Sequence, residues 1–354
     1  MTYLRGHRNR WHVLVGVILG IGLFGCSPLP KQSAGPEPTV VLAEPNKAAA
    51  QSEKITFSLE FEPGTKTRYR VTSEAVTAME NPETAFKDKA STTPFSKVSE
   101  SSEVVFTQEI LGPVPEDTNT VVALVTIEQV RYVRTSSRQP DLVFDNQESA
   151  DQNSPFAKLI SQTYTIEISP LGYVPGVFNL RTARLAVRGP TPAHAVALDL
   201  VSPPAIFARH GSFSLPGPDV GPLAVGGRWR GVQQVTLKAP GMDMDRLGTH
   251  RFEKIYQLES VEQRSVGAVA VVVFVGSPVP RRIPDSRLVD VPFLSCSYVG
   301  GGEFNLDVGL VENYLEQLEV RMPLTGTESP PLEGSEGRIV IATRFCRIQR
   351  LDLD

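Results

Sequence analysis

Apolar and polar residues alternate along much of this chain, and a period of two predicts β-strands. Residues 55–61 carry four apolar side chains on one strand face, and the turn signal Pro63-Gly64 follows them. The same period predicts strands over residues 67–76, 104–110, 120–133 and 164–168. Residues 80–102 and 135–154 are polar and are expected to form a long hairpin excursion and a loop. The first half therefore predicts antiparallel β-structure.

The second half carries strand signals of two kinds. Residues 266–275 are apolar and rich in valine, which predicts a central strand buried on both faces, with residues 228–238 and 249–260 as its antiparallel neighbours. Residues 310–322 fit either a helix face or a strand face that carries Tyr314, Leu318, Val320 and Met322. Residues 338–353 predict a last strand.

Two segments of the first half recur in the second. Gly64 and Tyr69 open one strand as Gly226 and Trp229 open another, and in each case an aromatic residue follows a glycine turn. Residues 164–174, with a turn at Gly172, parallel residues 303–311 in the same way. This repeat favours a strand over residues 310–322, and it predicts a duplicated β unit with halves at residues 54–210 and 211–354.

Short helices are expected between the two units. Residues 178–187 and 193–200 are rich in alanine and leucine, and prolines at 190, 192, 203 and 204 limit the length of any helix there. The predicted fold class is therefore mainly β, with antiparallel and curved sheets and an admixture of short helices.

The N-terminus has the layout of an export signal. Three arginines within the first ten residues precede an apolar run over residues 11–24, which is shorter than the roughly 20 residues that a membrane-spanning helix needs. The segment Leu23-Phe-Gly-Cys26 resembles the signal of bacterial lipoproteins. This resemblance implies that residues 1–25 are removed and that the Cys26 thiol carries a diacylglycerol. Ser27, rather than aspartate, follows the cysteine, which by the same resemblance points to the outer membrane.

Residues 26–53 are rich in proline and alanine, and we expect them to tether the body to the membrane. Removal of the three signal arginines from 35 basic residues leaves 32 against 39 acidic residues, a net charge of −7. This charge argues against nucleic acid as a partner.

The tethered Cys26, the stretch that leads to Gly226-Gly-Arg-Trp229 and the turn from Ile166 to Gly172 together resemble an uncharacterised family of bacterial lipoproteins built from duplicated β-strands. The resemblance spans most of residues 54–354. Its motifs are structural, so it supports the predicted fold and location and implies no catalytic residue.

No residue pattern predicts catalysis, a cofactor site or a metal site. Only three histidines follow the signal, His194, His210 and His250, and their spacing does not fit a metal site. Asp243-Met-Asp245 lacks the later acids of a calcium loop, and Gly300-Gly-Gly302 lacks the Lys-Ser/Thr of a phosphate loop and predicts a bulge or bend. With Cys26 acylated, Cys296 and Cys346 are expected to form a disulfide, and two buried thiols are the alternative.

Two classes of non-enzymatic function remain open. The first is an envelope lipoprotein that binds an apolar ligand or lipid on the inner face of a curved sheet, an architecture similar to that of periplasmic lipoprotein carriers. The second is a structural or assembly lipoprotein that contacts other envelope proteins. An open apolar face favours the first, and a filled core with exposed edge strands favours the second. The residues expected to line a ligand site are Phe57, Leu59, Phe61, Phe106, Ile166 and Ile168.

Overall fold

A computed structural model defines the fold of the protein body. It describes residues 54–80, 96–137, 140–146, 148, 152–211, 213–237, 248–279, 293–323 and 339–353. The expected signal and tether, and the Asp243-Met-Asp245 motif, lie outside these residues.

Within these residues, the chain forms one antiparallel sheet, with three α-helices and the 3₁₀ helix η3 (Ala157–Leu159) in the middle of the sequence. The strands of the first half are β1 (Lys66–Glu80), β2 (Ser96–Val114), β3 (Asp117–Ser136), β4 (Leu142–Asp145), β5 (Thr163–Ile168) and β6 (Val177–Phe178). The helices are α3 (Arg181–Ala186), α4 (Pro192–Leu200) and α5 (Pro203–His210). The strands of the second half are β7 (Arg228–Thr236), β8 (Thr249–Arg264), β9 (Gly267–Pro278), β10 (Ser295–Asn305), β11 (Leu310–Pro323) and β12 (Ile339–Leu351).

The strand order is β6-β5-β3-β2-β1-β12-β11-β10-β9-β8-β7, with β4 paired to β3. Each half is a meander of neighbouring strands, and the two halves join where β1 pairs with β12 over 13 residues. The chain crosses from one edge of the sheet to the other between β6 and β7, through the helices. The predicted mainly β, antiparallel fold is confirmed.

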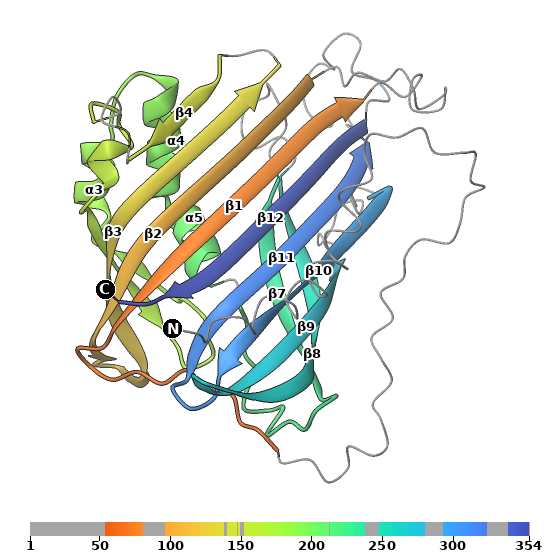
Figure 1. Ribbon diagram of the computed structural model, residues 1–354. Coiled ribbons are helices and arrows are strands. Elements are labelled where there is room, and N and C mark those ends of the chain that lie inside the picture. The colour runs from red at the N-terminus through yellow and green to blue at the C-terminus, as the bar shows by residue number, and fades with distance from the viewer. Residues whose placement is uncertain are drawn as a thin grey trace, which may run out of the picture.

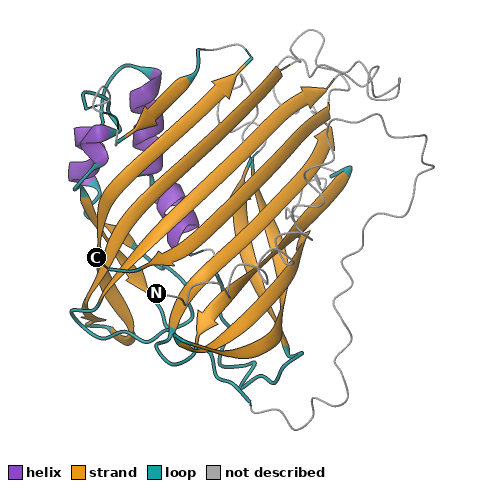
Figure 2. Cartoon of the chain, viewed as in Figure 1, coloured by secondary structure: helices purple, strands orange, loops and turns teal. Residues whose placement is uncertain are grey.

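The sheet is strongly curved, and its helices lie on the concave side. In Figure 1, β1–β3 and β10–β12 form a broad wall, and β7, β8 and β9 lie behind it. Figure 2 shows the three helices, in purple, on the same side of that wall. The helices therefore cover part of the inner face, which positions the core.

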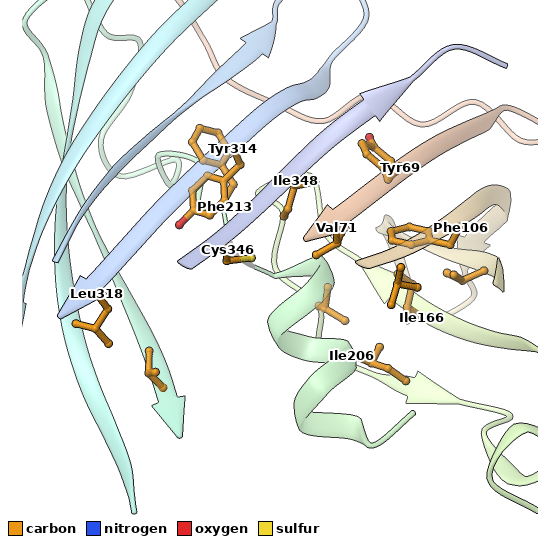
Figure 3. Close-up of a cluster of buried hydrophobic side chains, with 14 of the residues drawn as sticks. Tyr69, Val71, Phe106, Ile166, Ile206, Phe213, Tyr314, Leu318, Cys346 and Ile348 are labelled. Carbon is orange, nitrogen blue, oxygen red and sulfur yellow. The ribbon is translucent and has the colours of Figure 1, made fainter. Parts of the chain in front are cut away.

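The core is a single cluster on this inner face. Ile206 of α5 packs toward Phe106 and Ile166, and Phe213 packs beside Tyr314 (Figure 3). Alternate residues of the strands fill the same layer, because successive side chains of a strand point to opposite faces. The period of two in the sequence thus has its origin in one buried sheet face.

Proline begins two of the helices instead of interrupting them. Pro192 and Pro203 follow the N-cap residues Thr191 and Ser202, whose side chains accept hydrogen bonds from backbone N–H groups of the first turn. Proline is favourable at this position because the missing N–H has no partner within a helix. The expectation of short helices is confirmed.

Residues 55–61 alternate as predicted but belong to no strand. Phe57 is buried against Trp229 and Phe304, while its neighbours in sequence are exposed. The segment makes one isolated bridge, to Leu223, and otherwise bonds to single carbonyls such as that of Gly309. It crosses the turns at one end of the sheet, so no continuous ladder can form.

The valine-rich strand β9 is buried on one face only, which corrects the prediction of burial on both. Val272 and Phe274 point inward and are buried, whereas Val271 and Val273 point outward and are half-buried, because the helices cover only the inner face. Its neighbours are β8 and β10, so residues 228–238 lie one strand further away than predicted. The predicted strands over residues 310–322 and 338–353 are confirmed as β11 and β12.

The matched segments of the two halves occupy equivalent places in their meanders. Gly64 and Gly226 each precede the first strand by two residues, with φ of 85° and 87°. Such left-handed geometry favours glycine. Gly172 and Gly309 also have positive φ, at the turns after β5 and β10. This correspondence is consistent with duplication, which stays a prediction.

Candidate functional site

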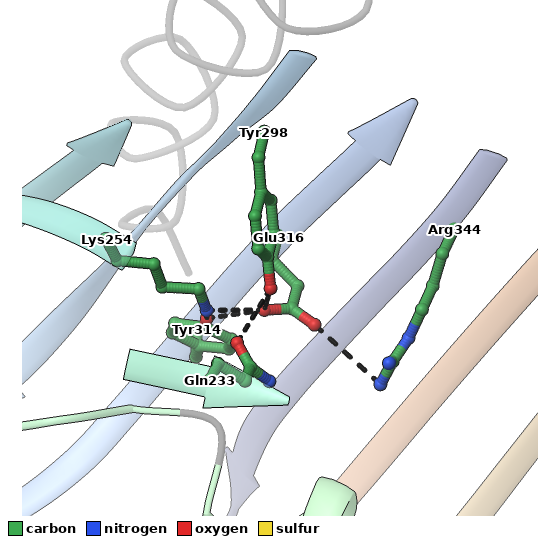
Figure 4. Close-up of polar contacts among 6 residues, drawn as sticks. All are labelled: Gln233, Lys254, Tyr298, Tyr314, Glu316 and Arg344. Atoms are coloured by element: carbon green, nitrogen blue, oxygen red, sulfur yellow. Dashed lines mark hydrogen bonds and ion pairs between the residues drawn. The ribbon is translucent and has the colours of Figure 1, made fainter. Parts of the chain in front are cut away.

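A polar cluster lies inside the otherwise apolar concave face, and Figure 4 shows its members. Lys254 and Glu316 are each only 1% exposed, which is unusual for charged residues. The cluster consists of Gln233 on β7, Lys254 on β8, Tyr298 on β10, Tyr314 and Glu316 on β11, and Arg344 on β12. We call it the Lys254 cluster.

Strand register brings these side chains together. Lys254 lies opposite Gly276, which in turn lies opposite Tyr298 on β10. The same row continues through Leu318 to Arg344. Because residues of one row point to one face, the two cations project into the same interior as Glu316, which belongs to the next row.

Glycines in these rows make room for the aromatic rings. A Cβ at Gly276 would lie 2.7 Å from the Tyr298 ring, and one at Gly300 would lie 2.5 Å from the Phe274 ring. Residues 300–302 pair in regular register with both neighbouring strands, so the prediction of a bulge or bend at Gly300-Gly-Gly302 is wrong. The register shift of β10 falls one residue later, between Glu303 and Phe304. The glycines permit close approach of rings to the backbone.

Hydrogen bonds converge on one oxygen of Glu316. Its Oε2 accepts from Lys254 Nζ at 2.8 Å, from the Tyr298 hydroxyl at 2.8 Å and from the Tyr314 hydroxyl at 2.7 Å. Lys254 Nζ also donates to the Tyr314 hydroxyl at 2.7 Å. Gln233 lies 2.7 Å from the Tyr298 hydroxyl. The atom of Gln233 that faces this hydroxyl is Oε1, so the single hydroxyl proton is shared between two acceptors, Gln233 Oε1 and Glu316 Oε2.

Aromatic rings surround the Lys254 ammonium. Its Nζ lies 4.4 Å from the ring centre of Phe274, 4.7 Å from that of Tyr298 and 5.4 Å from that of Tyr314. Rings at such distances attract a cation through their negative faces. Arg344 completes the cluster at 3.8 Å from Glu316 Oε1.

The environment fixes the charge states of the cluster. Burial by itself raises the pKa of Glu316, but the charges of Lys254 and Arg344 outweigh burial and lower this pKa to about 2. Burial lowers the pKa of Lys254, and the Glu316 carboxylate opposes that effect. Burial, aided by the Glu316 charge, raises the pKa of Tyr298 and Tyr314 well above the ordinary value.

This arrangement is suited to holding strands together rather than to chemistry. The carboxylate is ionised and saturated with donors, and the tyrosine hydroxyls stay protonated, so the cluster presents no free general base. Its hydrogen bonds and ion pairs connect β7, β8, β10, β11 and β12. We therefore assign the cluster a structural role.

A second polar contact docks helix α5 on the sheet. Arg209 donates to the Tyr164 hydroxyl at 3.1 Å and to the Leu200 carbonyl at 2.9 Å. His210 Nε2 lies 2.9 Å from the same hydroxyl, and its ring packs on Phe106. Burial, together with the Arg209 charge, lowers the pKa of His210 well below its ordinary value, so the imidazole is neutral.

The other two histidines of the body, His194 and His250, make contacts of their own. His194 contacts Thr191 at the start of α4, and His250 packs edge-on against Phe293. Within the described residues, no group of three or more histidine, cysteine or acidic side chains is arranged to hold a metal ion.

The predicted disulfide is wrong, because no bond joins the sulfur atoms of Cys296 and Cys346. Cys296 lies on β10 opposite Val320, and Cys346 lies on β12 opposite Glu316, with β11 between them. Two strand spacings and four residues of register separate their Cα atoms by roughly 16 Å, whereas a disulfide needs less than about 7 Å. The predicted lipidation site, Cys26, lies outside the described residues.

The side chains expected to line a ligand site fill the protein's own core. Phe57, Phe106, Ile166 and Ile168 are buried in the core cluster, and Leu59 and Phe61 pack against it, partly buried. These contacts are those of an ordinary core, and an apolar ligand held by these residues stays a prediction.

The two edges of the sheet differ. Edge strand β6 has two residues and lies against α5. Edge strand β7 has nine residues and, within the described part of the chain, pairs only with β8. Its outward side chains are exposed, including Val232 at 53%. A long unprotected edge is a template for strand addition.

The Lys254 cluster was missed from the sequence although a signal exists. Lys254 is two residues from each of Phe252 and Tyr256, so it shares the apolar face of its strand. Glu316 is likewise two residues from each of Tyr314 and Leu318. A charge on the apolar face of a predicted strand indicates a buried partner, but the partner's identity depends on the register between distant strands.

Comparisons with known proteins add little. No protein-family model and no curated protein match this chain. Among solved structures, an outer membrane channel from Pseudomonas putida F1 matches over 82% of this chain and 97% of that chain, at 9% identity and a TM-score of 0.22. So low a TM-score carries no argument. Among the described residues, no helix is long and apolar enough to span a membrane.

Proposed function

We propose that this protein is a lipid-anchored, non-enzymatic component of the bacterial cell envelope that assembles with protein partners through strand β7. The observation that carries this proposal is the combination of a filled inner face with one long edge strand that, among the described residues, pairs only with β8. The lipoprotein-like segment at Cys26 supports the anchor, and Ser27 supports the outer membrane as its location.

The backbone of β7 supports its use as a binding edge. The Leu237 N–H donates to the Gly248 carbonyl, which continues the β7–β8 ladder. Because hydrogen-bonded pairs alternate in an antiparallel ladder, the residues that bond to β8 are 229, 231, 233 and 235. Residues 228, 230, 232, 234 and 236 direct their N–H and C=O groups away from β8, toward the side on which the described residues place no strand. An added strand would satisfy these groups.

Among the described residues, most forms of edge protection are missing from β7. Natural edge strands are blocked by proline, bulges, charged side chains or covering elements. The charged side chains of β7 are Arg228 and Arg230, and both contact residues of β8. Residues 228–236 contain no proline, their pairing with β8 shows no register shift, and Val232 is an exposed apolar residue at the centre. The opposite edge consists of the two-residue β6 and the four-residue β4, so the two edges are not equivalent.

The anchor is tested by mass spectrometry of the membrane fraction from a bacterial host. We expect an N-terminal diacylated Cys26 and no residues 1–25, and we expect Cys26→Ser to release the protein from the membrane. An unprocessed N-terminus in the mature protein would contradict the lipoprotein assignment.

The assembly role is tested by photo-crosslinking of the full chain in intact cells. A photoreactive amino acid at Val232 is expected to yield a protein adduct. The same residue at Val143, an exposed valine on β4 with 62% exposure, is the matched control and is expected to yield none. If Val232 gives no protein adduct, the assembly role is wrong.

A further inference from the structure

We propose that the partner of β7 is β7 of a second copy of this chain, paired antiparallel about a two-fold axis at Val232. The inference rests on the proposed function, because it names the partner for the same edge. A two-fold contact uses one surface on both copies, which is the commonest arrangement in protein dimers.

The positions of the free backbone groups favour this register. Antiparallel pairing about Val232 sets residue 232 opposite its copy, 230 opposite 234, and 228 opposite 236. All five residues with edge-directed N–H and C=O groups then face one another and form hydrogen-bonded pairs. A shift of the axis by one residue in either direction leaves one of the five without a partner within β7.

Side-chain charge supports the same register. A two-fold axis at Val232 places Arg228 opposite Thr236 and Arg230 opposite Gln234, and both partners are neutral. An axis at Arg230 would place that arginine against its own copy, and directly opposed like charges are destabilising.

The arginines of β7 already have partners within their own chain. Arg230 lies 3.3 Å from Glu253, and Arg228 donates to Gln257 at 3.0 Å. The edge therefore does not require an acidic partner strand. Its distinctive exposed side chain is Val232, and a second Val232 on the axis buries both apolar side chains.

The experiment uses the detergent-solubilised full-length lipoprotein and two substitutions at the axis. We expect the unsubstituted protein to have twice the protein mass of one chain in sedimentation analysis. Val232→Arg places two cations on the axis and is expected to raise the dimer Kd by about tenfold or more, which corresponds to 1.4 kcal/mol. Circular dichroism checks that this exposed substitution leaves the fold intact.

Cysteine crosslinking tests the register directly. Opposed residues of a hydrogen-bonded pair have Cα atoms about 5.5 Å apart, which is within disulfide range. Val232→Cys is therefore expected to give a covalent dimer on mild oxidation, and Val143→Cys is the control that is expected to stay monomeric.

The outcomes separate this inference from the function on which it rests. A monomeric protein, a Val232→Arg dimer of unchanged affinity, or equal crosslinking of the two cysteine variants overturns the self-pairing. If the photoreactive residue at Val232 captures a different protein and no second copy, the assembly role stands and self-pairing is wrong. If it captures no protein, both are wrong.

Discussion

At the residue scale, the ion pair between Lys254 and Glu316 links stability to pH. The two groups are 2.8 Å apart and buried, so each depends on the other for its charge. Removal of one partner from a buried pair leaves an uncompensated charge, which costs far more than loss of an exposed ion pair.

Acid is therefore expected to destabilise the fold through Glu316. Its pKa is about 2 in the folded protein and 4.5 ordinarily. The contribution is present in full above pH 4.5 and is lost as pH falls toward 2, a change of about 3 kcal/mol. Glu316→Gln should remove this component of the pH dependence and lower stability at neutral pH by about 3–5 kcal/mol. Urea unfolding at a series of pH values measures both effects.

The control is Glu74→Gln, which changes an exposed glutamate on β1. It should change the free energy of unfolding by less than about 0.5 kcal/mol at any pH. Equal behaviour of the two variants would show that the buried pair does not govern acid stability.

The two cysteines of the body are expected to be in the reduced form, not joined by a disulfide. Burial raises the pKa of Cys296 to about 11, so little thiolate is present at neutral pH. Cys346 is buried on the inner face. In a Cys26→Ser variant without reductant, we expect slow alkylation of both thiols when folded and complete alkylation in denaturant. If both cysteines stayed unmodified after denaturation, the prediction of a disulfide between them would be correct instead.

At the element scale, strand β10 depends on its glycines. A Cβ at Gly300 would lie 2.2 Å from the Leu315 carbonyl oxygen as well as against the Phe274 ring, so backbone must move to accept it. Gly300→Ala is expected to destabilise the protein by about 1–3 kcal/mol. Thermal unfolding followed by circular dichroism measures the loss.

Gly231→Ala on β7 provides the comparison, since its nearest atoms would be 3.1 Å away and belong to side chains. It should cost clearly less than Gly300→Ala. If Gly300→Ala is as stable as the unsubstituted protein, ring packing over this glycine does not matter to the fold.

The sequence predicts the elements better than it predicts their neighbours. The period of two identifies β1 and β11, since each has one buried face. It misassigns residues 55–61, where alternation arises from a chain segment that packs one face on the core without a ladder. It also cannot show that β10 and β12 are separated by β11, which is why the expected Cys296–Cys346 bond fails. The local hydrophobic pattern predicts which side chains are buried, whereas the pairing of strands depends on the order of strands in the whole sheet.

At the scale of the whole molecule, the first and last strands of the body close the two halves into one sheet. β1 pairs with β2 on one side and with β12 on the other, with 13 paired residues at the junction. The core likewise extends across both halves as one cluster. Each meander alone would expose its junction strand as an unpaired edge.

We therefore expect the body to unfold in a single cooperative transition. Fluorescence of the buried Trp229, in the second half, should change at the same denaturant concentration as the far-ultraviolet circular dichroism of the whole sheet. A fragment of residues 54–210 expressed alone should lack cooperative unfolding, because β1 has lost β12 and its inner face has lost the packing that the second half supplies. If the protein unfolded in two separate transitions, or if the fragment unfolded cooperatively, the two predicted β units would be domains that fold independently and only pair at the β1–β12 junction.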